Sequence, residues 1–269
     1  SGLESVASPT FSVTLSTTPT RNITVPYSIT GGTATGDGGD YLLAAGTLTW
    51  NAGDDTTKTI SLTVIEDGID ENNETIIVSL GSPTSASLGI NTSHTYTIID
   101  NDPPPTVSFE STGTSASEVS TNVSIPVSLS SVSNFVATID YSVTGGTAIG
   151  NGVDYTLAAG TLTFPAGTTT QNISLVLNND LMVEGSENLV INLSNAGNAL
   201  IGSNSNFTFT ITDDDIAGVT ITPSGASTDI TEGGATDSYA IVLNTQPSSN
   251  VTITFNTGTQ VNPITNITF

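Results

Sequence analysis

The sequence predicts an all-β protein: tandem immunoglobulin-like antiparallel β-sandwich domains, the last one incomplete. Short apolar–polar alternations bounded by Gly, Pro, Asn and Ser recur along the chain, and no window has the spacing of an amphipathic helix. Segments repeat at a spacing of 114 residues, which is too long for a solenoid unit and suits a whole sandwich domain. The 269 residues give room for two such domains and part of a third.

Paired motifs define the repeats, because they occur twice in the same order. The pairs are Thr30–Ala34 (TGGTA) with Thr144–Ala148, Ala44–Trp50 (AAGTLTW) with Ala158–Phe164 (AAGTLTF), and Tyr96–Asp100 (YTIID) with Phe209–Asp213 (FTITD). A one-residue deletion changes the spacing to 113 before the last pair. We therefore divide the chain into a first repeat (residues 1–102), a second repeat (103–216) and a partial third repeat (217–269).

The second repeat contains a full set of strand signals. They lie near Val107–Ser111, Thr121–Ser128, Ala137–Thr144, Gly160–Phe164, Thr170–Leu177, Glu187–Leu193 and Asn206–Thr212. Short strands of this number and spacing predict a sandwich of two sheets. Phe164 and its counterpart Trp50 each end a short strand, so we expect both rings in the core between the sheets.

The first repeat lacks a counterpart of the opening strand. Glu4 aligns with Glu118, so whatever corresponds to Val107–Ser111 lies before Ser1 or is supplied from elsewhere. Because the chain starts at Ser1 without an initiator Met, we expect a mature or excised piece of a longer protein. Head-to-tail strand donation between copies is one way to complete the first repeat, and truncation is the simpler explanation.

The third repeat diverges from the other two. Strand signals lie at Gly218–Thr222, Ser238–Leu243 and Val251–Phe255, but the GGTA and Asp-Tyr motifs are absent. The connectors also differ. Asp100–Thr106 (DNDPPPT) predicts a short, stiff, polyproline-like linker, whereas Asp213–Gly218 (DDDIAG) lacks proline and should be looser.

Charge is the strongest global signal. Arg21 and Lys58 are the only strong bases against 25 acids, for a formal net charge of −23. Such a surface repels nucleic acid and anionic membranes and attracts divalent cations or basic partners. An alternative is that the acidity keeps a secreted or salt-adapted protein soluble.

The absence of cysteine excludes disulfides and thiolate metal sites, and no apolar run has the length of a membrane span.

Two acidic loops concentrate this charge. Asp67–Leu80 and Asp180–Leu193 each carry an Asp, a Glu four residues later and a Glu seven residues later, followed by a strand-like alternation. Carboxylates crowded beside a rigid strand repel one another unless a cation lies among them. Calcium accepts about six to eight oxygen ligands in flexible geometry, and magnesium demands a tighter octahedron. Zinc and copper lack suitable ligands, because His94 is the only histidine that could offer nitrogen. The alignment of His94 with Phe207 favours a structural or surface role for it.

These motifs together resemble the Calx-beta domain family. The resemblance rests on Gly-Gly-Thr-Ala followed by Asp-Tyr, the Gly-Thr-Leu-Thr-aromatic strand, the Asp-x3-Glu-x2-Glu loop and the acids after the last strand. It implies an antiparallel β-sandwich with calcium held by loops at one end. The implied ligands are Glu4, Asp40, Asp67, Glu71, Glu74, Asp100 and Asp102 in the first repeat, and Glu118, Asp154, Asp180, Glu184, Glu187, Asp213, Asp214 and Asp215 in the second. Asn101 replaces the counterpart of Asp214, which removes one charge, and in the third repeat only Glu232 matches.

These observations favour a calcium-binding structural or adhesive repeat segment of an extracellular or cell-surface protein, in which calcium rigidifies loops and domain junctions. We expect no enzyme, since no Lys, Arg or Cys is placed to activate a nucleophile. The expected partners are calcium ions, with neighbouring copies in a fibre or cell-surface ligands as further candidates, and no nucleic acid. The alternatives are a carbohydrate- or protein-binding module, or an accessory region of a larger secreted enzyme.

Overall fold

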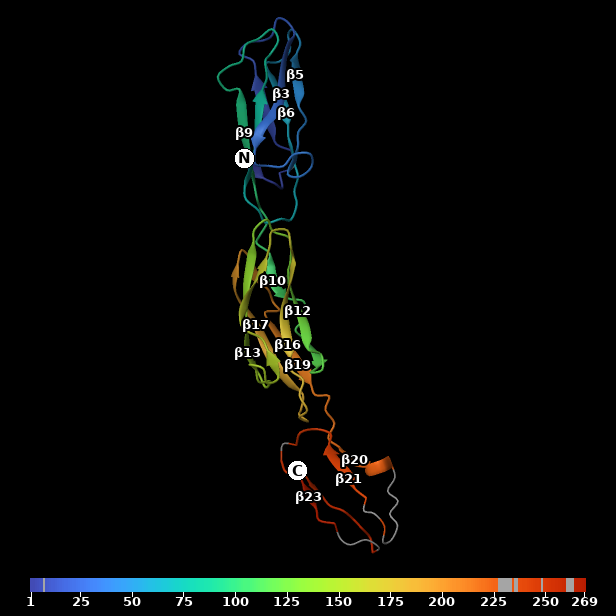
Figure 1. Cartoon of the computed structure of the whole chain (residues 1–269). Coiled ribbons are helices and arrows are strands. Elements are labelled where there is room, and N and C mark those ends of the chain that lie inside the picture. The colour runs from blue at the N-terminus through green and yellow to red at the C-terminus, as the bar shows by residue number, and fades with distance from the viewer. Residues whose placement is uncertain (7, 227–233, 235–236, 248, 260–263) are drawn as a thin grey trace.

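The computed structural model describes residues 1–6, 8–226, 234, 237–247, 249–259 and 264–269. The chain is elongated, and its three repeats follow one another end to end, with the first and third at opposite ends (Figure 1). Strands dominate, and the one helical segment in these ranges is a short 3₁₀ turn at Ser224–Ala226. No helix among the described residues is long and apolar enough to cross a membrane.

The second repeat is a sandwich of two five-stranded sheets, as the sequence predicts. One sheet has the order β14 (Tyr155–Thr156), β16 (Thr170–Leu177), β12 (Asn122–Leu129), β10 (Thr106–Phe109) and β18 (Leu200–Ile201). The other has the order β11 (Gly113–Ser117), β19 (Asn206–Thr212), β17 (Glu187–Gly197), β13 (Ala137–Gly146) and β15 (Gly160–Phe164). Both sheets bury alternate residues of each long strand in one core between them.

Two edge pairs depart from the antiparallel pattern. Strand β11 runs parallel to β19, and β10 runs parallel to β18. No sequence signal marks β11, because Gly113–Ser117 has no apolar alternation and most of it is exposed. The two-residue strands β14 and β18 are too short to produce a pattern. The core strands do alternate, and their predicted bounds agree with the observed bounds within a few residues.

The first repeat has one matching five-stranded sheet. Its order is β1 (Gly2–Leu3), β9 (Ser93–Ile99), β8 (Glu74–Leu80), β3 (Ile23–Gly32) and β5 (Gly46–Trp50). The facing strands form two pairs, β2 (Thr10–Thr14) with β6 (Thr57–Ser61) and β4 (Tyr41–Leu42) with β7 (Thr63–Val64). No strand in the described part of this repeat corresponds to β10 or β18.

The two predicted core aromatics are buried. Trp50 is 0% exposed and Phe164 is 1% exposed, each between the sheets of its repeat. The indole Nε1 of Trp50 donates a hydrogen bond to the Thr56 carbonyl oxygen at 3.1 Å, so the buried polar atom is satisfied.

The third repeat forms two separate two-stranded sheets. Strand β20 (Val219–Pro223) pairs with β21 (Tyr239–Leu243), and β22 (Thr252–Ile253) pairs with β23 (Ile267–Thr268). The predicted strands correspond to β20, β21 and β22, while β23 is an addition. Glu232, the single matching acid of this repeat, lies outside the described residues.

Candidate metal centre

The Gly-Gly-Thr-Ala motif turns the chain at one pole of each sandwich. Gly32 has φ +124°, and a Cβ there would lie 2.1 Å from the Thr75 carbonyl oxygen. Directly after it, the amides of Thr33 and Ala34 both donate to that same oxygen, at 2.9 and 3.0 Å. Only glycine permits this backbone conformation and this close approach. The motif thereby fixes the loop that carries Asp40 beside the start of β8, where Glu74 lies.

The second repeat reproduces this arrangement. Gly146 has φ +121°, and its Cβ would lie 2.2 Å from the Asn188 carbonyl oxygen. Thr147 and Ala148 donate to that oxygen at 2.8 and 2.9 Å. The loop after this turn carries Asp154, and Glu187 directly precedes Asn188.

The first acidic group of each repeat forms where this turn meets the acidic loop. In the first repeat, carboxylate oxygens of Asp40, Glu71 and Glu74 all lie within 4.8 Å of one another. In the second repeat, Asp154, Glu184 and Glu187 meet in the same way. The backbone amide of Thr35 donates to Asp40 Oδ2, and this bond holds the Asp40 carboxylate toward the group. We call each of these the turn-side group.

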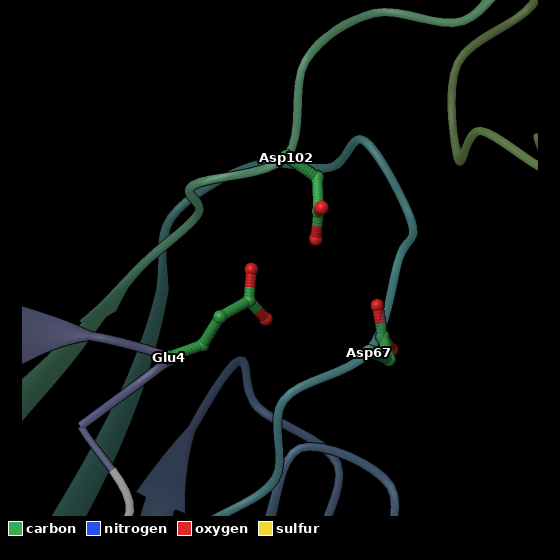
Figure 2. Close-up of side chains that lie close together, drawn as sticks. All are labelled: Glu4, Asp67 and Asp102. Carbon is green, nitrogen blue, oxygen red and sulfur yellow. The ribbon is translucent and has the colours of Figure 1, made fainter.

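A second acidic group lies on the side of the connector. Glu4, Asp67 and Asp102 come from three separate segments and point into one shared space (Figure 2), with carboxylate oxygens within 4.8 Å of one another. Their counterparts Glu118, Asp180 and Asp215 do the same. We call each of these the connector-side group.

Main-chain bonds explain how the connector-side groups come together. The amides of Glu4 and Glu118 donate to Ile99 O and Thr212 O, both at 3.1 Å, and so place each glutamate beside the end of the last strand. In the acidic loops, the amides of Ile69 and Met182 donate to Oδ1 of the preceding Asp67 and Asp180, at 2.8 and 2.6 Å. Each loop therefore folds back on its own aspartate.

Asp100 and Asp213 bridge the two groups. Asp213 accepts bonds from the amides of Glu184 at 2.8 Å and Asp215 at 2.9 Å. Asp100 accepts from the amides of Glu71 at 3.3 Å and Asp102 at 3.1 Å. One carboxylate in each repeat thus ties the acidic loop to the connector.

The position that differs between the repeats lies beside the groups. Asp214 Oδ1 accepts from Ser117 Oγ at 3.0 Å, and its counterpart Asn101 accepts from the Ser5 amide at 3.3 Å. Asn101 also donates from Nδ2 to Glu66 Oε1 at 3.0 Å. The four groups therefore contain twelve of the fifteen predicted ligands, while Asp100, Asp213 and Asp214 lie next to them.

Buried carboxylate oxygens in these groups have no protein partner. They are Glu74 Oε2, Asp102 Oδ2, Glu118 Oε1 and Asp215 Oδ2. Glu4 and Glu118 are themselves only 4% and 6% exposed. An unpaired buried oxygen costs free energy unless a cation or a donor satisfies it. Each of the two connector-side groups contains at least one such oxygen.

Four glutamates of these groups have pKa values well above their usual range. Loss of hydration on burial, together with neighbouring carboxylates, raises the pKa of Glu74 to about 8 and that of Glu4 to about 7. The same causes raise the pKa of Glu118 and of Glu187 to about 7. No basic side chain relieves this repulsion: among the described residues the single ion pair joins Lys58 to Asp54, away from the groups. Only an external cation can keep all these groups ionised at neutral pH.

The donor set fits a hard cation. Every converging atom is an oxygen, the groups come in adjacent sets, and the ligands sit on loops braced by main-chain hydrogen bonds. Such a set suits calcium, which accepts mono- and bidentate carboxylates and backbone carbonyls. His94, the one histidine, is exposed and lies against Phe11 at a ring-centroid distance of 4.9 Å. It belongs to none of the four acidic groups.

The sequence missed one part of this region. Asp70, in the first acidic loop, is buried against the second repeat, where Ser133 Oγ donates to its Oδ2 at 2.9 Å and the Asn134 amide donates to its carbonyl oxygen at 3.0 Å. The counterpart of Asp70 in the second repeat is Val183. Comparison of the repeats could not identify Asp70, because its counterpart in the second repeat, Val183, is not a carboxylate.

The Calx-beta domain family matches residues 1–102 and again residues 100–215, which together span most of the chain. The chain belongs to the Calx-beta family. Its first two repeats are tandem Calx-beta domains, and the four acidic groups lie within them. No curated protein matches the chain.

Solved structures of CALX and Calx domains are similar to the chain. CBD12 from CALX1.2 is 18% identical with a TM-score of 0.39, over 78% of this chain and 95% of that one. The calcium binding domain CBD12 of CALX1.1 is 20% identical with a TM-score of 0.37, over 76% and 79%. The apo-form Calx CBD1 domain is 24% identical with a TM-score of 0.40, over 42% and 100%.

Proposed function

We propose that the chain is a calcium-binding segment in which each Calx-beta domain holds calcium at one pole. The observation that carries this proposal is the pair of adjacent three-carboxylate groups, present in both domains and without a neutralising base among the described residues. Two adjacent groups per domain provide for at least two ions. Membership of the Calx-beta family supports the same function.

Calcium is the best match among the divalent ions. The buried unpaired oxygens of Glu118 and Asp215 in one group and Asp102 in its counterpart need a cation that accepts many oxygen ligands. Magnesium keeps several of its waters and selects a rigid octahedron, whereas these ligands lie on loops. Zinc favours nitrogen and sulfur, which the groups do not offer.

Calcium would also order the junction between the first two domains. Glu71 belongs to the turn-side group, and its neighbour Asp70 is bonded to Ser133 of the second domain. Without metal, repulsion among the carboxylates spreads the loop that carries both residues. With metal, the loop is fixed and presents Asp70 and Glu71 to the second domain in one geometry.

The function that follows is mechanical or adhesive and non-enzymatic. An elongated array with metal at its junctions is suited to a stalk, sheath or adhesin outside the cell, where calcium is abundant (Figure 1). The groups contain no nucleophile paired with a base, and their carboxylates crowd together instead of flanking an open substrate cleft. An extracellular location and partners beyond calcium are part of this proposal.

Thermal unfolding in calcium, in magnesium and in chelator tests the proposal. An ion that binds only the folded state at a concentration one hundred times its Kd stabilises it by about 2.7 kcal/mol. We expect the midpoint to be highest in calcium. The double variant Glu118→Gln with Glu187→Gln should lose the calcium effect in the second domain. Asp55→Asn, an exposed residue outside the groups, is the matched control and should keep it. Identical melting curves in all three solutions would exclude a calcium function.

A further inference from the structure

The two junctions between repeats are built from equivalent segments. At the first junction, Asp70 of the first acidic loop forms an isolated parallel bridge with Ser133, which lies between β12 and β13 of the second domain. At the second junction, Met182 of the second acidic loop forms a parallel bridge with Gln246 of the third repeat. In both cases the acidic loop of one repeat pairs with the segment of the next repeat that follows β12 or its counterpart β21.

The register of this pairing is the same at both junctions. The acidic loops align at a shift of 113 residues, so the counterpart of Asp70 is Val183. The segments after β12 and β21 align at a shift of 114 residues, so the counterpart of Ser133 is Pro247. The bridge observed at the second junction lies one residue earlier in both segments and therefore sets Val183 opposite Pro247. We call Asp70 with Ser133, and Val183 with Pro247, the bridge pairs.

One main-chain hydrogen bond crosses each junction beside its bridge pair. The Asn134 amide donates to the Asp70 carbonyl oxygen at 3.0 Å, and the Gln246 amide donates to the Leu181 carbonyl oxygen at 2.7 Å. In the shared register these bonds are successive rungs of one parallel ladder. Main-chain bonds do not depend on side-chain identity, so a choice of neighbour has to come from the bridge pairs.

The side chains of the two bridge pairs match in different ways. Asp70 and Ser133 are only 7% and 2% exposed, and Ser133 Oγ donates to Asp70 Oδ2 at 2.9 Å. A hydrogen bond to an ionised carboxylate is stronger than one between neutral groups, so this bond offsets the burial of the charge. Val183 and Pro247 carry no polar side-chain atom. One pair is therefore a carboxylate with a hydroxyl, and the other is aliphatic on both sides.

The accepting segment is held by its own domain. Ser133 Oγ accepts from the Phe135 amide at 3.1 Å, and the Ser133 carbonyl oxygen accepts from the Gly167 amide at 3.0 Å. In the first domain, the Gly53 amide donates at 2.8 Å to the carbonyl oxygen of Pro19, the counterpart of Ser133. The same backbone shape thus forms with serine or with proline at this position.

The acidic loops also present their bridge residues in the same way. The amide directly after the bridge residue donates to the aspartate that ends the last strand: Glu71 to Asp100 at 3.3 Å and Glu184 to Asp213 at 2.8 Å. Because both backbones are fixed alike, the difference between the junctions lies in the bridge side chains themselves.

A mismatched bridge pair would be costly. An aspartate opposite proline would be buried without a donor, and a valine opposite serine would leave the hydroxyl without its acceptor. Specific interfaces exclude a wrong partner through unpaired polar groups of this kind. The first acidic loop therefore fits a repeat that offers a hydroxyl, and the second fits a repeat that offers an aliphatic ring.

We propose that the bridge pairs determine which repeat docks on each acidic loop. The partner of an acidic loop is a neighbouring repeat whose residue at the Ser133 position matches the loop in polarity. This specificity goes beyond calcium binding, because none of the bridge residues belongs to the four acidic groups. The order of the repeats along the array is thereby fixed by side chains beside the acidic groups.

Hydrogen exchange of the Asn134 amide tests the proposal at the first junction, because this amide donates across it. Asp70→Val and Ser133→Pro should each lower its protection at least about tenfold, since each leaves one residue unmatched. The double variant should recover most of the protection, because it reproduces the aliphatic pair. Asp70→Asn should keep it, since an amide oxygen still accepts from Ser133 Oγ. Asp55→Val, at an exposed site of the first domain, controls for loss of a carboxylate.

The Gln246 amide provides the reverse experiment at the second junction. Val183→Asp alone should lower its protection, because a carboxylate then lies opposite Pro247. Val183→Asp with Pro247→Ser should raise the protection above that of the unmodified chain, because this double variant reproduces the carboxylate–hydroxyl pair. Melting temperatures check that the domains of each variant remain folded, and all variants are compared at one calcium concentration.

Coupling between the two residues of a pair is the decisive result. Effects of the single changes that simply add in the double variants would overturn the proposal, because matching requires a double variant to differ from the sum of its parts. Unchanged protection of the Asn134 amide in both single variants would overturn it as well. Recovery at one junction without the gain at the other would show that the pairs do not act by a common rule, which also contradicts the proposal.

Discussion

Asn134 of the second domain donates from Nδ2 to Glu71 Oε2 of the first domain at 2.6 Å. Glu71 is at the same time a member of the turn-side group with Asp40 and Glu74. One carboxylate therefore faces both the turn-side group and the neighbouring domain. Burial and the charges of Asp40 and Asp67 raise its pKa, and the Asn134 bond lowers it. The junction and the turn-side group therefore share this side chain.

The change Asn134→Ala should loosen the junction without unfolding either domain. The side chain contacts Glu71 across the junction, so its loss removes an interdomain bond and leaves both cores intact. We expect unchanged melting in chelator and a smaller effect of calcium on interdomain motion, measured by small-angle scattering or NMR relaxation. Asn172→Ala, an exposed residue on β16, is the matched control. Equal interdomain order in the two variants would show that Glu71 does not couple metal to the junction.

The second junction should respond to calcium less strongly than the first. Among the described residues, a main-chain bond from the Gln246 amide to the Leu181 carbonyl oxygen, at 2.7 Å, crosses this junction. Val183 replaces Asp70 there, so in the part of the chain that the structure describes no buried carboxylate joins the second acidic loop to the third repeat. Spin labels placed on both sides of each junction measure the distribution of distances across it. Calcium should narrow this distribution at the first junction and leave it broad at the second. Equal narrowing at both would contradict this asymmetry.

Glu118→Gln should have opposite effects with and without calcium. Its Oε1 is buried without a partner, and nearby Asp180, Asp213 and Asp215 repel its charge. In chelator the neutral amide relieves that repulsion, so the melting temperature of the second domain should rise. Calcium titration should show at least about a tenfold loss of affinity, about 1.4 kcal/mol, because a charged ligand is gone. Glu110→Gln, an exposed residue of the same domain, should change neither quantity.

Stability in chelator should fall as the pH rises from about 5 to about 8. The folded-state pKa values of Glu4, Glu118 and Glu187 are about 7 and that of Glu74 is about 8, against a usual value of 4.5. Between these limits the folded state holds more protons than the unfolded state, so raising the pH favours unfolding. Calcium competes with the same protons, so its stabilising effect should grow over the same interval. Melting temperatures at several pH values, with calcium and with chelator, measure both slopes, and a flat curve in chelator would contradict the burial of these carboxylates.

The sequence located the four acidic groups because their residues repeat. Asp67 and Asp180 have the same acids at the same distances, and two occurrences in the same order distinguish a recurring group from a chance run of acids. The division into a turn-side and a connector-side group was not predictable, because it depends on where β1 and β11 pair, and these edge strands have no apolar pattern. Asp100 and Asp213 were predicted as ligands from the resemblance to the Calx-beta family, whereas their hydrogen bonds to loop amides depend on the three-dimensional path of the connector.

The glycine turn should prove essential for the turn-side group. Gly146→Ala puts a Cβ 2.2 Å from the Asn188 carbonyl oxygen at φ +121°, so the turn that places Asp154 beside Glu187 must shift. Backbone strain of this kind costs about 1–3 kcal/mol, and the steric overlap adds to it. The adjacent Gly145 has open space at its Cβ position, so Gly145→Ala is a control within the same motif. We expect Gly146→Ala to lower the melting temperature in chelator and to weaken calcium binding, and Gly145→Ala to leave the calcium affinity unchanged. If both variants bound calcium like the unmodified chain, the turn would serve the fold alone and Asp154 would not depend on it.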